Sequence, residues 1–176
     1  MPDLTRRLAR LRVPLGFASA IVVVWLAQPT RVSVVVGSLV AAAGEALRVW
    51  AAGHLNKSRE VTSSGPYRIV AHPLYVGSSI MGAGLAVACA SVPVAVIIAA
   101  YLGVTITAAI RSEEAFLRDR FGDRYDRYRS GRGARDGEAS TRRFALAQAM
   151  ANREYRALSG LVAAMALLAL KAAYGL

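Results

Sequence analysis

Cysteine is nearly absent from this sequence, since Cys89 is the single copy and lies within an apolar run. One thiol forms neither a disulfide nor a cysteine-based metal site within a monomer, so we interpret Cys89 as a small buried hydrophobe. The chain also lacks a P-loop, a GxGxxG dinucleotide motif and an HExxH zinc motif. These absences exclude many motif-defined nucleotide and metal enzymes, and we expect no metal site.

Charged residues are absent from two long stretches, residues 13–30 and 69–110. The second stretch is long enough for two membrane spans of about 20 residues each. Hydrophobic residues make up 55% of the chain, and the mean hydropathy is +0.39. We therefore predict an all-α fold, an integral membrane helical bundle.

Acidic residues are scarce, with 11 against 22 basic residues and a net charge of +11. Such an excess also occurs in nucleic-acid-binding proteins, but here most arginines flank the apolar stretches. The positive-inside rule describes this distribution for cytoplasmic loops. We expect no nucleic-acid partner, and we place the N-terminus and the segments 54–72 and 111–156 in the cytoplasm, with the C-terminus outside.

The apolar pattern predicts about five transmembrane helices. They cover residues 13–27, 32–53 and 73–90, the stretch from a turn at 91–93 to residue 110, and residues 157–170. The first follows a basic arm and could imitate a signal peptide, but further spans follow, so we expect a retained helix. Residues 111–130 carry an apolar stripe, which predicts a cytoplasmic amphipathic helix after the fourth span.

Two charges interrupt the second predicted span, Glu45 and Arg48, and their spacing places them on one helix face. Charges within a span often mark function. They can also form an ion pair near the interface, with Arg48 snorkelling toward the headgroups. Both interpretations stay open, and we favour the ion pair.

The most distinctive stretch is residues 65–77, which read GPYRIVAHPLYVG. Pro66 and Pro73 disfavour helix in the residues before them, so Pro73 is expected to open a helix with His72 at its mouth. A tight hairpin of the third and fourth spans would bring His72 close to Glu113 and Glu114. The alternative is a loop that caps a membrane helix, followed by glutamates that begin a surface helix.

This combination of helix mouth, carboxylates and aromatic rings suits a zwitterionic ligand with a cationic centre. Amines and sulfonium ions pair with carboxylates and aromatic faces, whereas a ligand carboxylate prefers helix N–H groups and arginine.

These residues resemble the signature of the isoprenylcysteine carboxyl methyltransferase family and its phospholipid methyltransferase relatives. The resemblance rests on residues 65–68, on residues 72–77, and on the pattern E-E-x-x-L-x-x-x-F-G-x-x-Y-x-x-Y from Glu113 to Tyr128. It covers about residues 54–130. Two departures concern the acceptor, because the family usually has arginine or a similar polar residue at the position of Ala71 and often has a proline-containing stretch soon after Tyr128.

The resemblance implies an S-adenosylmethionine-dependent methyltransferase of EC 2.1.1 type, with S-adenosylhomocysteine as product. Its cofactor-binding positions correspond here to His72, Pro73, Tyr75, Gly77, Glu113, Glu114 and Tyr125. Arg68 and Glu114 are the implied catalytic residues, with Arg68 holding an anionic substrate group. The implied acceptor is a lipophilic molecule, isoprenoid or lipid-like, that enters from the bilayer and offers a carboxylate or another nucleophile.

The domain organisation that follows is a single membrane domain over residues 1–176. Residues 1–53 form an N-terminal two-helix part, 54–130 the cofactor-binding core, and 131–176 a linker with the last span. The composition, rich in arginine and alanine, looks bacterial, so we expect the bacterial inner membrane. Two other functions stay open: an NADPH-dependent reductase similar to sterol reductases, and a non-enzymatic membrane scaffold.

Overall fold

The computed structural model describes residues 21–56, 62–123, 125–126, 130 and 143–175. Within these ranges all regular elements are helical, which confirms the predicted all-α class. The elements are α2 (Arg31–His54), the 3₁₀ turn η1 (Gly65–Arg68), α3 (Pro73–Cys89), α4 (Val92–Phe121), α6 (Leu146–Ala151) and α7 (Tyr155–Tyr174). Residues 21–26 are helical as well.

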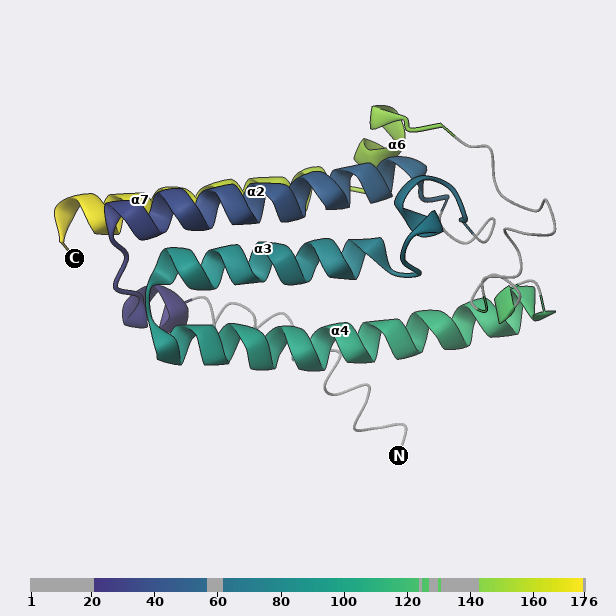
Figure 1. The fold of residues 1–176 in the computed structure, drawn as a ribbon, viewed down its shortest axis with the longest axis horizontal. Coiled ribbons are helices and arrows are strands. Elements are labelled where there is room, and N and C mark those ends of the chain that lie inside the picture. The colour runs from purple at the N-terminus through teal and green to yellow at the C-terminus, as the bar shows by residue number, and fades with distance from the viewer. Residues whose placement is uncertain (1–20, 57–61, 124, 127–129, 131–142, 176) are drawn as a thin grey trace.

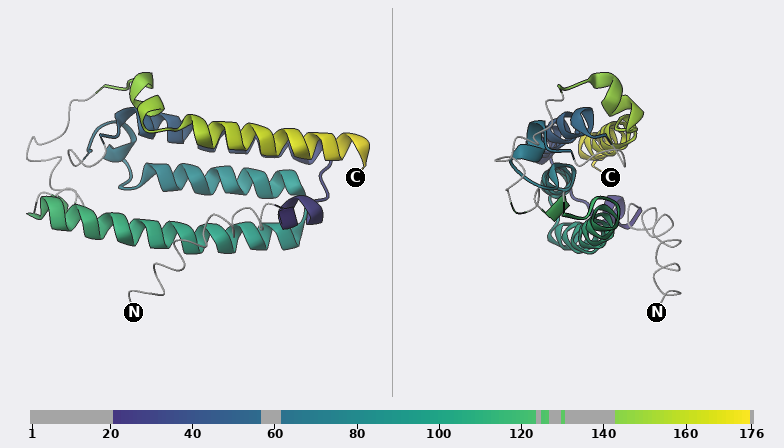
Figure 2. Two further views of the ribbon diagram at one scale, coloured as in Figure 1. Left: turned by 180° about the vertical axis from the view of Figure 1, so that it is seen from behind. Right: turned by 90° about the vertical axis from the view of Figure 1, so that its right-hand side faces the viewer.

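The long helices run side by side, with α3 between α2 and α4 and with α7 alongside α2 (Figures 1 and 2). By length and composition, α2, α4 and α7 can each cross a membrane. Helix α3 is also apolar, and its 17 residues are at the short end of the range for a span. The first predicted span lies mostly outside the described residues, as do the basic arm and Tyr128.

The fourth helix differs from the sequence prediction in its length. It does not end near residue 110 but runs without a break to Phe121, where Gly122, with φ +47°, ends it. Residues 111–121 contain neither glycine nor proline and are rich in strong helix formers, so nothing in them stops the helix. The sequence predicts a separate amphipathic helix over residues 111–130. Its first part, residues 111–121, instead continues the membrane-spanning helix α4.

Glycine brings the backbones of α2 and α3 close together. A Cβ atom added at Gly44 would lie 2.5 Å from the amide nitrogen of Met81, and one at Gly84 would lie 2.4 Å from that of Ala41. Small residues permit this close approach in membranes, where apolar burial does not drive helices together. Ser33 Oγ adds a hydrogen bond to the Ala88 carbonyl across the interface, at 3.1 Å.

The segment before α7 caps the C-terminal end of α2. Gln148 Nε2 donates to the Leu55 carbonyl at 2.9 Å. Asn152 Nδ2 donates to the carbonyls of Ala52 and Leu55, at 2.8 and 2.9 Å. These bonds satisfy carbonyls that have no partner within the helix, and they fix α6 on α2.

A small apolar core closes the opposite end of the bundle, where the C-terminus lies (Figure 1). Cys89 is fully buried there as a free thiol, as its apolar surroundings predicted. The other buried members are Val23, Ala27, Val34, Ala88, Val94 and Leu168.

The glycine contacts predict that Gly84→Ala destabilises the protein. The added methyl group meets backbone atoms of α2, so the helices must separate, and we expect a loss of about 1–3 kcal/mol. Gly160→Ala is the matched control, because a Cβ atom at Gly160 meets nothing within 4 Å. Thermal unfolding in detergent measures both variants, and equal melting temperatures would contradict the packing account.

Candidate functional site

The 65–77 motif folds as its prolines predicted. Pro66 lies in the first turn of η1, and Pro73 is the first residue of α3. His72 is the residue before the helix, and its side chain makes no capping hydrogen bond there. The imidazole is therefore free to reach toward α4.

Two polar pairs join the beginning of α3 to the end of α4. His72 Nε2 lies 3.2 Å from Glu114 Oε1. One turn further along α3, the Tyr75 hydroxyl donates to Glu113 Oε2 at 2.9 Å. The side chains of His72 and Glu114 are 13% and 17% exposed. The prediction that the hairpin brings His72 close to the Glu113–Glu114 pair is confirmed.

Arg118 links Tyr125 to this cluster, because it contacts both the Tyr125 ring and Glu114. The chain turns at Gly122, whose carbonyl accepts from the Tyr125 amide at 3.0 Å. The Tyr125 ring is buried, and the Arg118 guanidinium lies 5.9 Å from its centroid. Arg118 is also 4.0 Å from Glu114 Oε2, so the turn after α4 packs against the glutamate side of the site.

Three predicted site residues lie apart from this cluster. Arg68 is exposed at the end of η1, and its side chain makes no hydrogen bond or ion pair with another described residue. Pro73 is buried as the helix-opening residue. Gly77 faces α2 instead of α4, because a Cβ atom there would lie 2.7 Å from the Gly44 carbonyl oxygen. In the structure, Gly77 permits close helix packing.

A second polar cluster lies on the α2 side of α3 and includes a residue that sequence reasoning missed. Arg48 Nε donates to Glu154 Oε1 at 2.6 Å, whereas Glu45 Oε2 lies 3.6 Å away. Arg48 Nη1 donates to Ser78 Oγ and, at 3.5 Å, to the Leu74 carbonyl. The predicted pair of Glu45 and Arg48 is present, but Glu154 is the closer partner. An acidic residue just before the last apolar run was the available signal.

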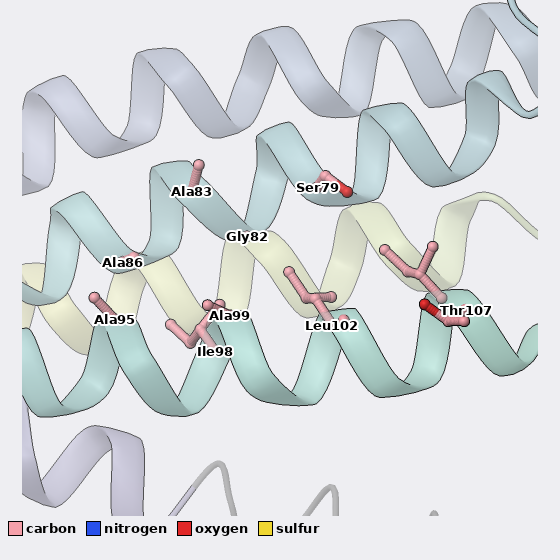
Figure 3. A pocket seen from close by; sticks show the side chains of 11 residues that line it. Ser79, Gly82, Ala83, Ala86, Ala95, Ile98, Ala99, Leu102 and Thr107 are labelled. Carbon is pink, nitrogen blue, oxygen red and sulfur yellow. The ribbon is translucent and has the colours of Figure 1, made fainter.

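A groove of about 360 Å³ lies between α3 and α4. Small side chains form much of its wall (Figure 3); they include Ser79, Gly82, Ala83 and Ala86 of α3, and Ala95, Ala99, Gly103 and Thr107 of α4. Ser79 is one turn beyond Tyr75, and Thr107 is about 9 Å before Glu113 along the helix. The groove therefore leads along the apolar part of the hairpin toward the polar pairs.

The described residues contain no group of three histidine, cysteine or acidic side chains placed to hold a metal ion. What they contain is a pair of carboxylates, an imidazole and a phenol at the mouth of a membrane-helix hairpin. This donor set fits a ligand with a cationic centre.

Fold and site together define an all-helical membrane protein with a polar site at one end of a helix hairpin. A model of the phospholipid methyltransferase family matches residues 32–124, more than half of the chain. The chain belongs to this family of membrane methyltransferases, which confirms the family resemblance. Neither a curated protein nor a solved structure matches it. The match contains both polar pairs and ends before Tyr125, α6 and α7.

The Tyr75–Glu113 contact predicts that Tyr75→Phe weakens the hairpin. The variant removes a hydrogen bond to a carboxylate and leaves Glu113 without this donor, so we expect a loss of about 1–3 kcal/mol. Tyr101→Phe is the control, because that tyrosine is exposed on α4. Unfolding in a detergent titration measures both, and the account is contradicted if the two variants lose the same stability.

Proposed function

We propose that this chain is an S-adenosylmethionine-dependent methyltransferase that acts on a lipophilic acceptor. The observation that carries the proposal is the pairing of His72 with Glu114 and of Tyr75 with Glu113 inside the family-matched segment. The family supports methyl transfer, and the donor set fits the cationic cofactor. S-adenosylmethionine, when bound, supplies a methyl group activated by its sulfonium centre.

In this proposal, the polar pairs bind and orient the cofactor. The carboxylates of Glu113 and Glu114 attract its positive groups, and the rings of His72 and Tyr75 supply aromatic faces. These rings lie with their centroids 5.8 Å apart. Glu114 is the proposed catalytic carboxylate, Tyr125 packs on the glutamate side of the site, and Pro73 fixes the start of α3 beside His72. Gly77 contributes by keeping α3 close to α2.

The chemistry needs alignment and a dry site more than proton transfer. Attack by an anionic nucleophile on a sulfonium methyl group neutralises two charges, so removal of water favours the step. An acceptor carboxylate is already deprotonated and requires no general base, whereas an amine acceptor must first release its ammonium proton to water before it attacks. We propose that Arg68, at the exposed end of η1, holds the anionic group of the acceptor.

The groove between α3 and α4 is the proposed binding site for the apolar part of the acceptor. Its walls are small and mostly apolar, and it leads toward the Tyr75–Glu113 pair. An amphiphile that partitions into the bilayer can enter sideways and keep its nucleophile near the polar pairs. Lipid and isoprenoid acceptors of the phospholipid or isoprenylcysteine type fit this arrangement.

The proposed topology has the N-terminus and the site in the cytoplasm and the C-terminus outside, in a bacterial inner membrane. In support, η1, the end of α4 and α6 gather at one end of the bundle, opposite the C-terminus (Figure 1). These are the segments with the basic flanks that the positive-inside rule places in the cytoplasm. Residues 54–130 are the proposed cofactor-binding core, between the 1–53 and 131–176 parts.

Calorimetry with S-adenosylhomocysteine on detergent-purified protein tests the cofactor. We expect binding to the wild type and at least a tenfold weaker Kd for His72→Ala and Glu114→Gln, about 1.4 kcal/mol. Asp119→Asn is the matched control, because Asp119 is exposed on the same helix. Binding of NADPH alone would assign the protein to the reductases. Absence of binding to folded protein would favour a scaffold.

A substitution in the groove tests the acceptor. Gly103 lines the groove, and a Cβ atom added there meets nothing within 4 Å, so we expect Gly103→Leu to narrow the groove without disturbing the fold. We expect at least tenfold less labelled methyl transfer to phosphatidylethanolamine vesicles or a prenylated cysteine, whichever the wild type methylates, with unchanged cofactor affinity. Gly160→Leu on α7 is the control. Undiminished transfer in Gly103→Leu would exclude the groove.

A further inference from the structure

Glu154 lies outside the family-matched segment, yet its carboxylate is buried against the matched core. The residue is 7% exposed, and its Oε1 accepts from Arg48 Nε at 2.6 Å. The two residues are 106 positions apart in the chain. The contact thus joins the C-terminal segment to a helix that carries none of the predicted cofactor residues.

The position of Glu154 is fixed by the segment before it. Asn152 holds that segment on the carbonyls of α2, and Arg153 adopts a positive φ of 63° that turns the chain toward α7. Glu154 therefore enters the α2–α7 interface from an anchored corner. A carboxylate anchored in this way can hold the Arg48 guanidinium in a fixed position.

Arg48 carries the contact from Glu154 to α3. Its Nη1 donates to Ser78 Oγ and to the Leu74 carbonyl, and Ser78 Oγ itself donates to that carbonyl at 2.9 Å. Leu74 and Ser78 flank Tyr75 in the first turns of the helix. The guanidinium therefore contacts α3 on its α2 side, while Tyr75 bonds Glu113 on the α4 side.

We propose that Glu154 is a positioning residue for the methyl-transfer site, which it orders by holding Arg48 against the first turns of α3. The inference rests on the proposed function for its catalytic consequence. Glu154 acts through Arg48 and Leu74 on the Tyr75–Glu113 contact and touches no cofactor. Through Glu154, the C-terminal segment, which lies outside the family match, thus helps to hold the methyl-transfer site in place.

Glu45 provides the matched comparison on the same guanidinium. It is 4% exposed, and neither of its carboxylate oxygens has a hydrogen-bond partner in the described part of the chain. Its closest approach to Arg48 Nε is 3.6 Å. Glu154→Gln removes the charge of the hydrogen-bonded partner and leaves Arg48 only the longer contact with Glu45, whereas Glu45→Gln keeps the Arg48–Glu154 pair and loses no hydrogen bond. Glu154→Gln and Glu45→Gln are therefore the same change with different expected results.

The experiment uses the full chain in detergent and two independent measurements. The first is the Kd of S-adenosylhomocysteine, measured well below the melting temperature of each variant. The second is hydrogen exchange of the peptide that contains residues 73–80, without ligand. We expect Glu154→Gln to weaken binding at least fivefold and to speed exchange in this peptide, and Glu45→Gln to change either value less than twofold.

Ser78→Ala removes one of the two hydrogen bonds from Arg48 to α3 and leaves both the Arg48–Glu154 pair and the bond to the Leu74 carbonyl. We expect it to speed exchange in the same peptide, and it decides the question if Glu154→Gln does not fold. A purely structural role for Glu154 would lower its variant's melting temperature but leave affinity and exchange unchanged, and that result would overturn the inference. Equal effects of the two glutamine variants would overturn it too.

A failure of the proposed function gives a different result. If the wild type bound no S-adenosylhomocysteine, the function would be overturned while the exchange measurement still tests the contact with α3. Faster exchange in Glu154→Gln but not in Glu45→Gln would support the positioning role. Unchanged exchange in both Glu154→Gln and Ser78→Ala would overturn it.

Discussion

The close packing of α2 against α3 is the constraint on which the rest of the structure depends. Lipid supplies little apolar driving force between helices, so the pair relies on backbone approach at glycines such as Gly44 and Gly84. This contact fixes the position of α3 along the axis of α2. Arg48 then meets the first turns of α3 from one side, and His72 and Tyr75 face α4 on the other.

The fourth helix packs differently, and that difference matters for function. Helix α4 meets α3 through polar pairs at one end, while along their apolar length the two helices border a groove and touch where Leu102 packs on Gly82. A tightly packed pair thus supports a more open third helix. Such an arrangement can hold a polar cofactor at the membrane surface and an apolar acceptor within the bilayer.

Much of this arrangement could be predicted from the sequence, because its signals are local. Proline and the loss of charge mark α3, predicted over 73–90 and found at Pro73–Cys89. The short turn after it made the meeting of His72 with Glu114 predictable. The end of α4 was not predictable in this way, since an amphipathic stripe looks the same in a separate helix and in an extension. Glu154 was missed because its partner lies 106 residues away.

The central claim is that the His72, Tyr75, Glu113 and Glu114 cluster binds S-adenosylmethionine. Ultraviolet cross-linking of labelled S-adenosylmethionine to the purified protein, followed by peptide mapping, tests it most directly. The account predicts label in peptides from residues 65–78 or 111–126, competed away by S-adenosylhomocysteine. Label confined to other helices, or none on folded protein, would contradict it.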